Sequence, residues 1–320
     1  MSLVSTARGP IPTDQLGFVL MHEHIVLQSP GVRANWPDTL DQHAAIQRSV
    51  TKLNEAKAAG VDTLVDLTTM DNGRDVPLIA EIAAQTDVQV VVATGMWRLV
   101  PRYFMDKTPD DLARLFVADI TQGVQGTTVK AAIIKNASDD RTISGLQDLA
   151  FRAAARAHRQ TGVPLSTHTN VFEQSGLDQQ RIYAEEGVDL TRVIIGHSGD
   201  TDDLDYLHRL LDRGSYLGMD RFGLDHFGPQ KFLDTPGRVR VIAALCAQGY
   251  ADRLVLSHDA GCWPDGRSVA FQEQTWPNWR YTHVPSEVVP ALREAGVSKE
   301  HMELMTRGNP RKIFEQQSPY

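Results

Sequence analysis

The sequence of 320 residues predicts a single (β/α)8 barrel domain covering residues 1–320. Eight short apolar runs alternate with longer amphipathic stretches, as in a barrel in which each strand is followed by a helix. Each run is continuously apolar, which is typical of parallel strands covered on both faces. Polar residues of similar chemistry stand at the C-terminal ends of several runs. An open doubly wound sheet is the alternative, but the sequence has no Gly-rich phosphate turn after the first expected strand, where that fold would need one.

The strands are expected, in chain order, at residues 18–24, 63–69, 88–95, 131–137, 163–169, 192–198, 215–221 and 252–259. Their enrichment in β-branched residues favours strands over short buried helices. The clearest helical patterns cover residues 40–60, 146–162 and 202–214. Each of these patterns ends at a glycine, a residue that often terminates helices. The active site of such a barrel is expected at the C-terminal ends of its strands.

Composition excludes several classes of partner and suggests a compartment. The formal net charge is −8, and no basic run offsets it, so we expect neither a nucleic-acid partner nor an anionic membrane partner. The apolar runs are too short to span a bilayer, and the first residues show no signal-peptide core. The only cysteines, Cys246 and Cys262, do not form a disulfide framework. We therefore expect a cytoplasmic protein.

The motif His22-Glu23-His24 lies in the first expected strand. Side chains alternate along a strand, so the two histidines point to the same side, with Cα atoms roughly 6.5–7 Å apart. Both could reach one metal ion from inside the barrel. Two hydrogen-bonded core histidines are an equally good interpretation of this motif alone, and Glu23 is expected to face away from the pair.

The metal interpretation is favoured by three other residues, which come much later in the sequence. His168, His197 and Asp259 each stand at the end of an expected strand. Imidazoles and carboxylates are the ligands that Zn²⁺ and similar divalent ions prefer. One such histidine would more often be structural, but several at matched strand ends predict a metal site.

Lys135 is unusual because it interrupts the apolar strand "AAIIKNA". Its stem could lie along apolar surface while its ammonium group reaches water or a carboxylate. A buried lysine also loses its proton more easily, which makes the amine reactive.

The order of these residues resembles that of the phosphotriesterase family within the amidohydrolase superfamily. The stretches "TARGPI", "MHEH", "STHT", "GLDQQRIYAEEGVDL", "IIGHSGD", "GMDRFGLD" and "LSHDA" are similar, more narrowly, to the phosphotriesterase-like lactonases. The resemblance runs over nearly the whole chain. It implies a binuclear centre at the strand ends with the ligands His22, His24, Lys135, His168, His197 and Asp259.

The resemblance implies that His22, His24 and Asp259 bind the more buried metal and that His168 and His197 bind the more exposed one. Lys135, carboxylated on its amine, bridges the two ions together with a hydroxide. The ligand set suits zinc first, with iron, cobalt or manganese as alternatives. The hydroxide attacks the substrate carbonyl, and Asp259 transfers its proton to the leaving alkoxide. The resemblance also suggests a homodimer.

Four residues are expected to contact the substrate. Arg221 separates lactonases from true phosphotriesterases by resemblance, although a salt bridge with Asp200 would also explain it. Trp97 stands where the lactonases usually have tyrosine. Trp263 is expected near the entrance, in a loop at residues 260–279 that contains three tryptophans and would form an aromatic lid. Cys262 could line the same entrance, although buried packing is the more usual place for a free cysteine.

These features predict a metal-dependent lactonase acting on a small molecule. The expected substrates are N-acyl-homoserine lactones or related γ/δ-lactones, with weak promiscuous phosphotriesterase activity. A dedicated phosphotriesterase and an amidohydrolase acting on C–N bonds are alternatives. A third possibility, from a different class, is a non-catalytic barrel that binds a metal or a ligand.

Overall fold

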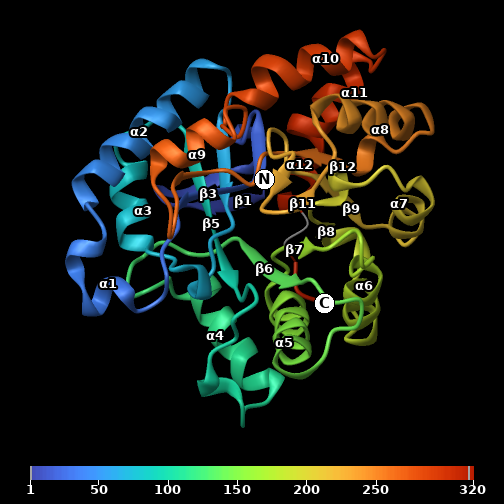
Figure 1. Cartoon of the computed structure of the whole chain (residues 1–320). Helices are drawn as coiled ribbons and strands as arrows, with labels where there is room; N and C mark the ends of the chain where they lie inside the picture. Colours follow the sequence, from blue (N-terminus) through green and yellow to red (C-terminus); the bar gives the residue numbers. More distant parts are fainter. Residues whose placement is uncertain (1, 316–317) are drawn as a thin grey trace.

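A cylindrical sheet of parallel strands surrounded by helices forms the centre of the protein (Figure 1). The computed structural model describes residues 2–315 and 318–320. All eight expected strands are confirmed, and each pairs in parallel with the next along the chain. They are β3 (Val19–Val26), β4 (Thr63–Asp66), β5 (Gln89–Gly95), β6 (Ile133–Ser138), β7 (Leu165–Thr169), β8 (Val193–Ile195), β9 (Tyr216–Met219) and β12 (Leu254–Leu256).

The barrel closes where the first of these strands, β3, meets the segment that follows the last, β12. The backbone N–H of Asp259 donates to the carbonyl of His22 at 2.9 Å, and that of His24 donates to the carbonyl of Ala260 at 2.8 Å. The buried Glu23 carboxylate accepts the backbone N–H of Ala260 at 2.9 Å. Glu23 therefore stabilises the closing seam, and its carboxylate is not among the ligand-type side chains gathered inside the barrel.

The expected helices are also confirmed, and others join them on the outside of the barrel. They are α1 (Val32–Asn35), α2 (Gln42–Ala58), α3 (Val76–Ala83), α4 (Pro109–Thr121), α5 (Gly145–Thr161), α6 (Gly176–Glu185), α7 (Leu204–Leu211), α8 (Thr235–Ala247), α9 (Val269–Thr275), α10 (Val289–Glu294), α11 (Lys299–Glu303) and α12 (Asn309–Glu315). Asp41 and Asp203 cap α2 and α7 by accepting backbone N–H groups. Within the described residues, no helix is long and apolar enough to cross a membrane.

Several short strands were not expected, because two to four residues give too little periodicity to detect. β1 (Leu3–Thr6) and β2 (Gly9–Pro12) form an N-terminal hairpin, and β10 (His226–Phe227) and β11 (Gln230–Lys231) form another. β13 (Gly261–Trp263) pairs in parallel with β3. The expected lid at residues 260–279 therefore contains both β13 and α9.

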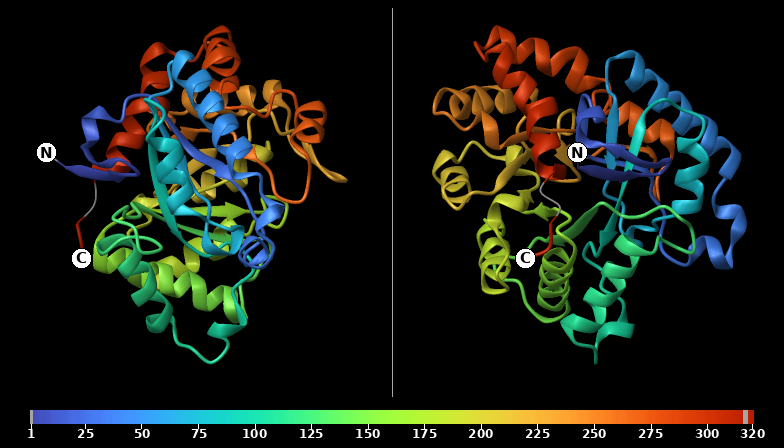
Figure 2. Two further views of the ribbon diagram at one scale, coloured as in Figure 1. Left: turned by 90° about the vertical axis from the view of Figure 1, so that its left-hand side faces the viewer. Right: turned by 180° about the vertical axis from the view of Figure 1, so that it is seen from behind.

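An apolar plug closes one end of the barrel. Val4 from β1 and Phe314 from α12 pack with inward-facing strand residues such as Val65 and Val91. Figure 2 shows the N-terminal hairpin and the last helix next to each other at this end. At the opposite end, the C-terminal ends of the strands face a cavity.

Candidate metal centre

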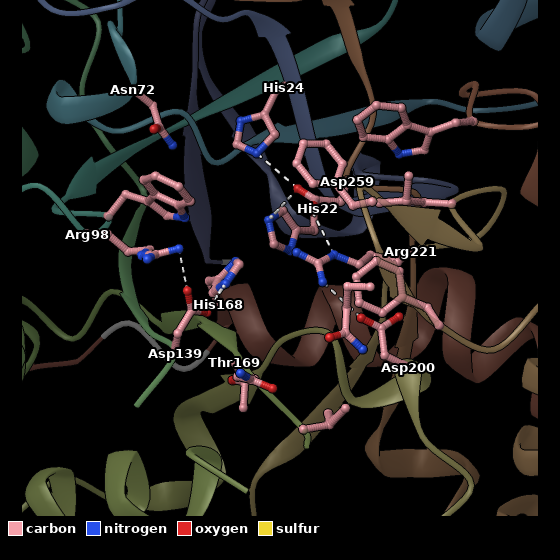
Figure 3. Close-up of a pocket in the computed structure, with 18 of the residues that line it drawn as sticks. His22, His24, Asn72, Arg98, Asp139, His168, Thr169, Asp200, Arg221 and Asp259 are labelled. Carbon is pink, nitrogen blue, oxygen red and sulfur yellow. Dashed lines mark hydrogen bonds and ion pairs between the residues drawn. The ribbon is translucent and has the colours of Figure 1, made fainter. Parts of the chain in front are cut away.

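Asp259 lies at the centre of a group of histidines (Figure 3). Its Oδ1 atom is 3.2 Å from Nε2 of His22 and 3.1 Å from Nε2 of His24. Its Oδ2 atom is 3.7 Å from Nε2 of His197. One ligand atom each from His22, His197 and Asp259 lies within 4.8 Å of the other two. Residues from opposite ends of the chain therefore converge on one point.

The remaining two expected ligands adjoin this group. Nδ1 of His168 lies 2.9 Å from Nε2 of His197, and Nζ of Lys135 lies 2.9 Å from Nε2 of His22. Lys135 is buried in β6, with its side chain inside the barrel. The structure thus brings together all six residues that the sequence analysis selected as ligands.

Burial lowers the basicity of several of these groups. Burial and the nearby charge of Lys135 lower the pKa of His22 to about 4. Burial also lowers the pKa of His197 well below its usual value. Both imidazoles are therefore neutral near pH 7 and can offer a lone pair to a metal. Burial lowers the pKa of Lys135 to about 7, so a substantial fraction of its amine is unprotonated and nucleophilic.

Carboxylates outside the expected ligand set fix which nitrogen His22, His168 and His197 offer to the centre. Asp220 accepts from Nδ1 of His22 at 2.7 Å and from Nδ1 of His197 at 2.9 Å, which leaves both Nε2 atoms facing the centre. Asp139 contacts Nε2 of His168 at 2.8 Å and leaves its Nδ1 facing inward. Asp139 and Asp220 were not predicted as site residues, although both follow the end of a strand, as Asp259 does.

The backbone is strained at two of the expected ligands. His197 and Asp259 both have a φ of +58°, in the left-handed region that residues other than glycine rarely adopt. His197 stands two residues after the end of β8 and Asp259 three residues after the end of β12, so this conformation turns the chain as it leaves the barrel wall. Such strain is concentrated at functional sites because the surrounding structure must maintain it. It also explains why β8 and β12 end before the expected boundaries.

The donor set fits a pair of divalent ions. Imidazoles, one carboxylate and a lysine amine are gathered around a common centre at the open end of the barrel. These donors suit Zn²⁺ and similar borderline ions. Carboxylation would turn the lysine from a cation that repels two metals into an anion that can bridge them.

A cavity of about 400 Å³ opens above this centre. Trp97 and Arg221 line it, as expected from the sequence. Its base is polar, whereas its walls are largely apolar and include Leu27, Val171, Phe172, Leu224, Phe227, Phe232 and Trp279. The Trp97 ring stands edge-on to His168, with ring centroids 5.8 Å apart. The cavity therefore joins a base that contains the expected metal ligands to a wall suited to apolar groups.

The placement of Cys262 and Trp263 corrects the sequence analysis, because neither residue lines this cavity. Cys262 is buried on β13, and its thiol lies 3.2 Å from the hydroxyl of Tyr281. Trp263 lines a neighbouring cavity. Pairing of β13 with β3 holds both residues in the barrel wall, and Trp279 lines the central cavity instead.

Arg221 forms the expected salt bridge with Asp200 and also lines the cavity. Its Nη1 lies 2.9 Å from Oδ2 of Asp200, and its Nε lies 3.1 Å from Oδ2 of Asp259 (Figure 3). Asp200 is itself anchored by the buried Arg238 at 2.7 Å. Arg221 therefore lines the cavity while linking a ligand carboxylate to the barrel wall.

Comparison with known proteins gives a consistent result. The model of the phosphotriesterase family matches residues 2–314. The phosphotriesterase homology protein of Mycobacterium tuberculosis (strain ATCC 25618 / H37Rv) is 45% identical, and the alignment covers 100% of both chains. The aryldialkylphosphatase of Saccharolobus solfataricus is 35% identical, over 98% of this chain and 100% of the relative. The solved phosphotriesterase structure from Mycobacterium tuberculosis matches with a TM-score of 0.94 and 44% identity, covering 99% of this chain and 100% of that one.

Proposed function

Because the chain belongs to the phosphotriesterase family, whose members are metal-dependent hydrolases, we propose that it is a lactonase. Its proposed substrates are N-acyl-homoserine lactones or related γ/δ-lactones. The observation that supports this is the junction of a His/Asp centre with a largely apolar cavity wall. A lactone ring would place its carbonyl at the polar base, and an acyl arm would contact the wall.

The residues around Asp259 support its role in proton transfer. Two divalent ions at this centre would lower the pKa of coordinated water and polarise the substrate carbonyl. The Arg221 side chain orients the Asp259 carboxylate, with Nε 3.1 Å from Oδ2. Asp259 can then accept a proton from the attacking water and return it to the ring oxygen that leaves. Because that oxygen stays attached in a lactone, the product is a hydroxy acid.

The wall after β5 is held rigidly enough to position a substrate. The backbone N–H of Trp97 donates to Oδ1 of Asp71 at 2.7 Å, and that of Leu99 donates to Oδ2 at 2.9 Å. Asp71 is buried, so these contacts are shielded from water. The Trp97 ring therefore offers a fixed apolar surface beside the metal-binding histidines.

Hydrolysis of phosphotriesters is a second candidate function. It is favoured by the name of the Saccharolobus solfataricus relative, which states this activity.

Zinc-loaded protein should be assayed in a pH-stat with lactones of varied ring size and acyl length, and with an aryl dialkyl phosphotriester. We expect kcat/KM for the best lactone to exceed that for the phosphotriester by at least about a hundredfold, or ~3 kcal/mol of transition-state stabilisation. Turnover of the phosphotriester alone would contradict the lactonase proposal. Turnover of N-acyl amides alone would indicate an amidohydrolase, and turnover of none of these by metal-loaded protein would indicate a binding protein.

A further inference from the structure

The three arginines that line the central cavity differ in their partners. Arg98 forms an ion pair with Asp139, and Arg221 forms ion pairs with Asp200 and Asp259. Arg267 also lines the cavity, but none of the described carboxylates lies within ion-pair distance of its guanidinium group. Among the described residues, its side chain also donates no hydrogen bond to protein.

A shortage of carboxylates does not explain why Arg267 has no ion-pair partner among the described residues. The chain has 40 acidic residues against 32 lysines and arginines. The acidic neighbour in sequence, Asp265, instead accepts a hydrogen bond from the hydroxyl of Ser29 at 2.6 Å. Arg267 is thus a cation facing a cavity in an acidic protein, with its hydrogen-bonding capacity available to a ligand.

Aromatic rings hold Arg267 in place without using that capacity. Its Cζ atom lies 4.8 Å from the ring centroid of Phe227 and 5.5 Å from that of Trp276. Phe227 and Trp276 stack with their centroids 5.7 Å apart, and the indole N–H of Trp276 donates to the carbonyl of His226 at 2.8 Å. Contact with a ring uses the face of a guanidinium group, whereas its N–H donors lie in the plane. The group is therefore oriented in advance for an anion.

Arg267 also stands where two cavities meet. Together with Leu27, it lines both the central cavity and a neighbouring cavity of about 480 Å³. The neighbouring cavity has apolar walls that include Val32, Leu40, Trp263 and Val269. A substrate whose reacting bond lies at the metal centre could extend an arm past Arg267 toward this second cavity.

We propose that Arg267 is a specificity-determining residue that binds an anionic group, a carboxylate or a sulfonate, on an arm of the substrate remote from the bond that is cleaved. This inference rests on the proposed function only in taking the reacting end of the substrate to be at the metal centre. A planar guanidinium group can donate two parallel hydrogen bonds to such an anion, which gives orientation as well as attraction. The preferred substrates are then hydrolysable molecules that carry a negative charge.

The first test compares two lactones that differ only at the end of the acyl arm, one with a carboxylate and one with the uncharged primary amide. The native enzyme should show a KM about tenfold lower for the carboxylate, in the range of one charge-assisted hydrogen bond. Arg267→Gln should bring the KM ratio close to one, and Arg267→Lys should restore part of the preference. An unchanged ratio in Arg267→Gln would overturn the proposal.

The second test does not depend on lactone hydrolysis. Binding of hexanesulfonate and of hexan-1-ol to the zinc-loaded protein is measured by isothermal titration calorimetry. Arg267→Gln should weaken hexanesulfonate binding about tenfold relative to hexanol. Arg102→Gln, which removes an exposed arginine outside the cavity lining, should not. If no lactone reacts but hexanesulfonate binding depends on Arg267, the proposed function fails and the anion site stands. Equal hexanesulfonate affinity in the native protein and Arg267→Gln would overturn the anion site whatever the enzyme hydrolyses.

Discussion

The Asp220 carboxylate accepts a hydrogen bond from Nδ1 of His22 at 2.7 Å, although 198 positions separate the two residues in the sequence. Its other oxygen accepts from Nδ1 of His197 at 2.9 Å. One buried acid thus sets the tautomer of two expected ligands on different strands. The backbone packs closely around this carboxylate. A side chain at Gly218 would displace it, because an added Cβ atom would lie 2.5 Å from Oδ2 of Asp220.

Replacing Asp220 by asparagine should weaken metal binding. The asparagine amide has a single acceptor oxygen, so its NH2 group would face one of the two Nδ1–H donors. We expect metal affinity to fall about tenfold to a hundredfold, as measured by zinc retention during dialysis against a competing chelator. Asp202→Asn, at an exposed position, is the matched control. Equal zinc retention in Asp220→Asn and the native protein would contradict the positioning role.

Lys135 should be required as the precursor of a bridging anion. Lys135→Ala should reduce kcat at least about a thousandfold, because loss of the bridge would leave the two metals with unshielded repulsion. Added acetate or propionate should restore part of the activity by supplying a carboxylate in the vacated space. Lys130→Ala, at an exposed position before β6, should retain full activity without rescue. Full activity of Lys135→Ala without added acid would show that no bridge is needed.

Gly95 should be essential for stability because it lies against the strand that bears Lys135. Its φ is +120°, and an added Cβ would lie 1.9 Å from the Lys135 carbonyl oxygen. We expect Gly95→Ala to destabilise the protein by about 3 kcal/mol through backbone strain and overpacking together. Gly60→Ala is the matched control, since Gly60 has a φ of +96° but nothing within 4 Å of the added atom. Equal loss in the two variants, measured by urea unfolding, would show that the close contact is unimportant.

His158 should contribute to acid destabilisation away from the metal centre. Burial lowers its pKa to about 4. Its Nδ1–H donates to the Val163 carbonyl at 2.7 Å, while its Nε2 accepts from the Tyr320 hydroxyl at 2.7 Å. Because the folded-state pKa lies below the unfolded value, the unfolded chain binds the extra proton between about pH 6.5 and pH 4. The free energy of unfolding should therefore decrease as the pH is lowered through this window, and His158 should account for up to ~3 kcal/mol of the decrease.

The comparison of His158→Gln with the native protein measures this contribution. Between pH 7 and pH 4.5 the variant should lose about 2–3 kcal/mol less stability than the native protein in urea unfolding. The exposed His43 on α2 offers the control, because His43→Gln should lose as much as the native protein. The same loss in all three proteins would mean that His158 does not titrate on unfolding.

The barrel strands could be predicted because local properties define them. Their apolar runs are continuous, and the glycines that follow the helices mark turns. The short strands could not be predicted, since β13 exists through pairing with β3 rather than through its own periodicity. That pairing also explains why Cys262 lies beside Tyr281 and why Trp263 lines a neighbouring cavity.

The sequence by itself determined the eight strands and the chemical kind of the six expected ligands, because strand periodicity and donor chemistry are properties of the residues themselves. Only the tertiary structure decided which carboxylates orient the histidines, which tryptophan of the 260–279 loop lines the cavity and which cavity arginine has no carboxylate partner among the described residues. Those properties depend on distances between side chains far apart in the chain, and closure of the barrel sets these distances. The sequence indicated a partner for Arg221 but did not distinguish Arg98 from Arg267, and only the fold pairs Arg98 with Asp139 and leaves Arg267 without a carboxylate partner among the described residues.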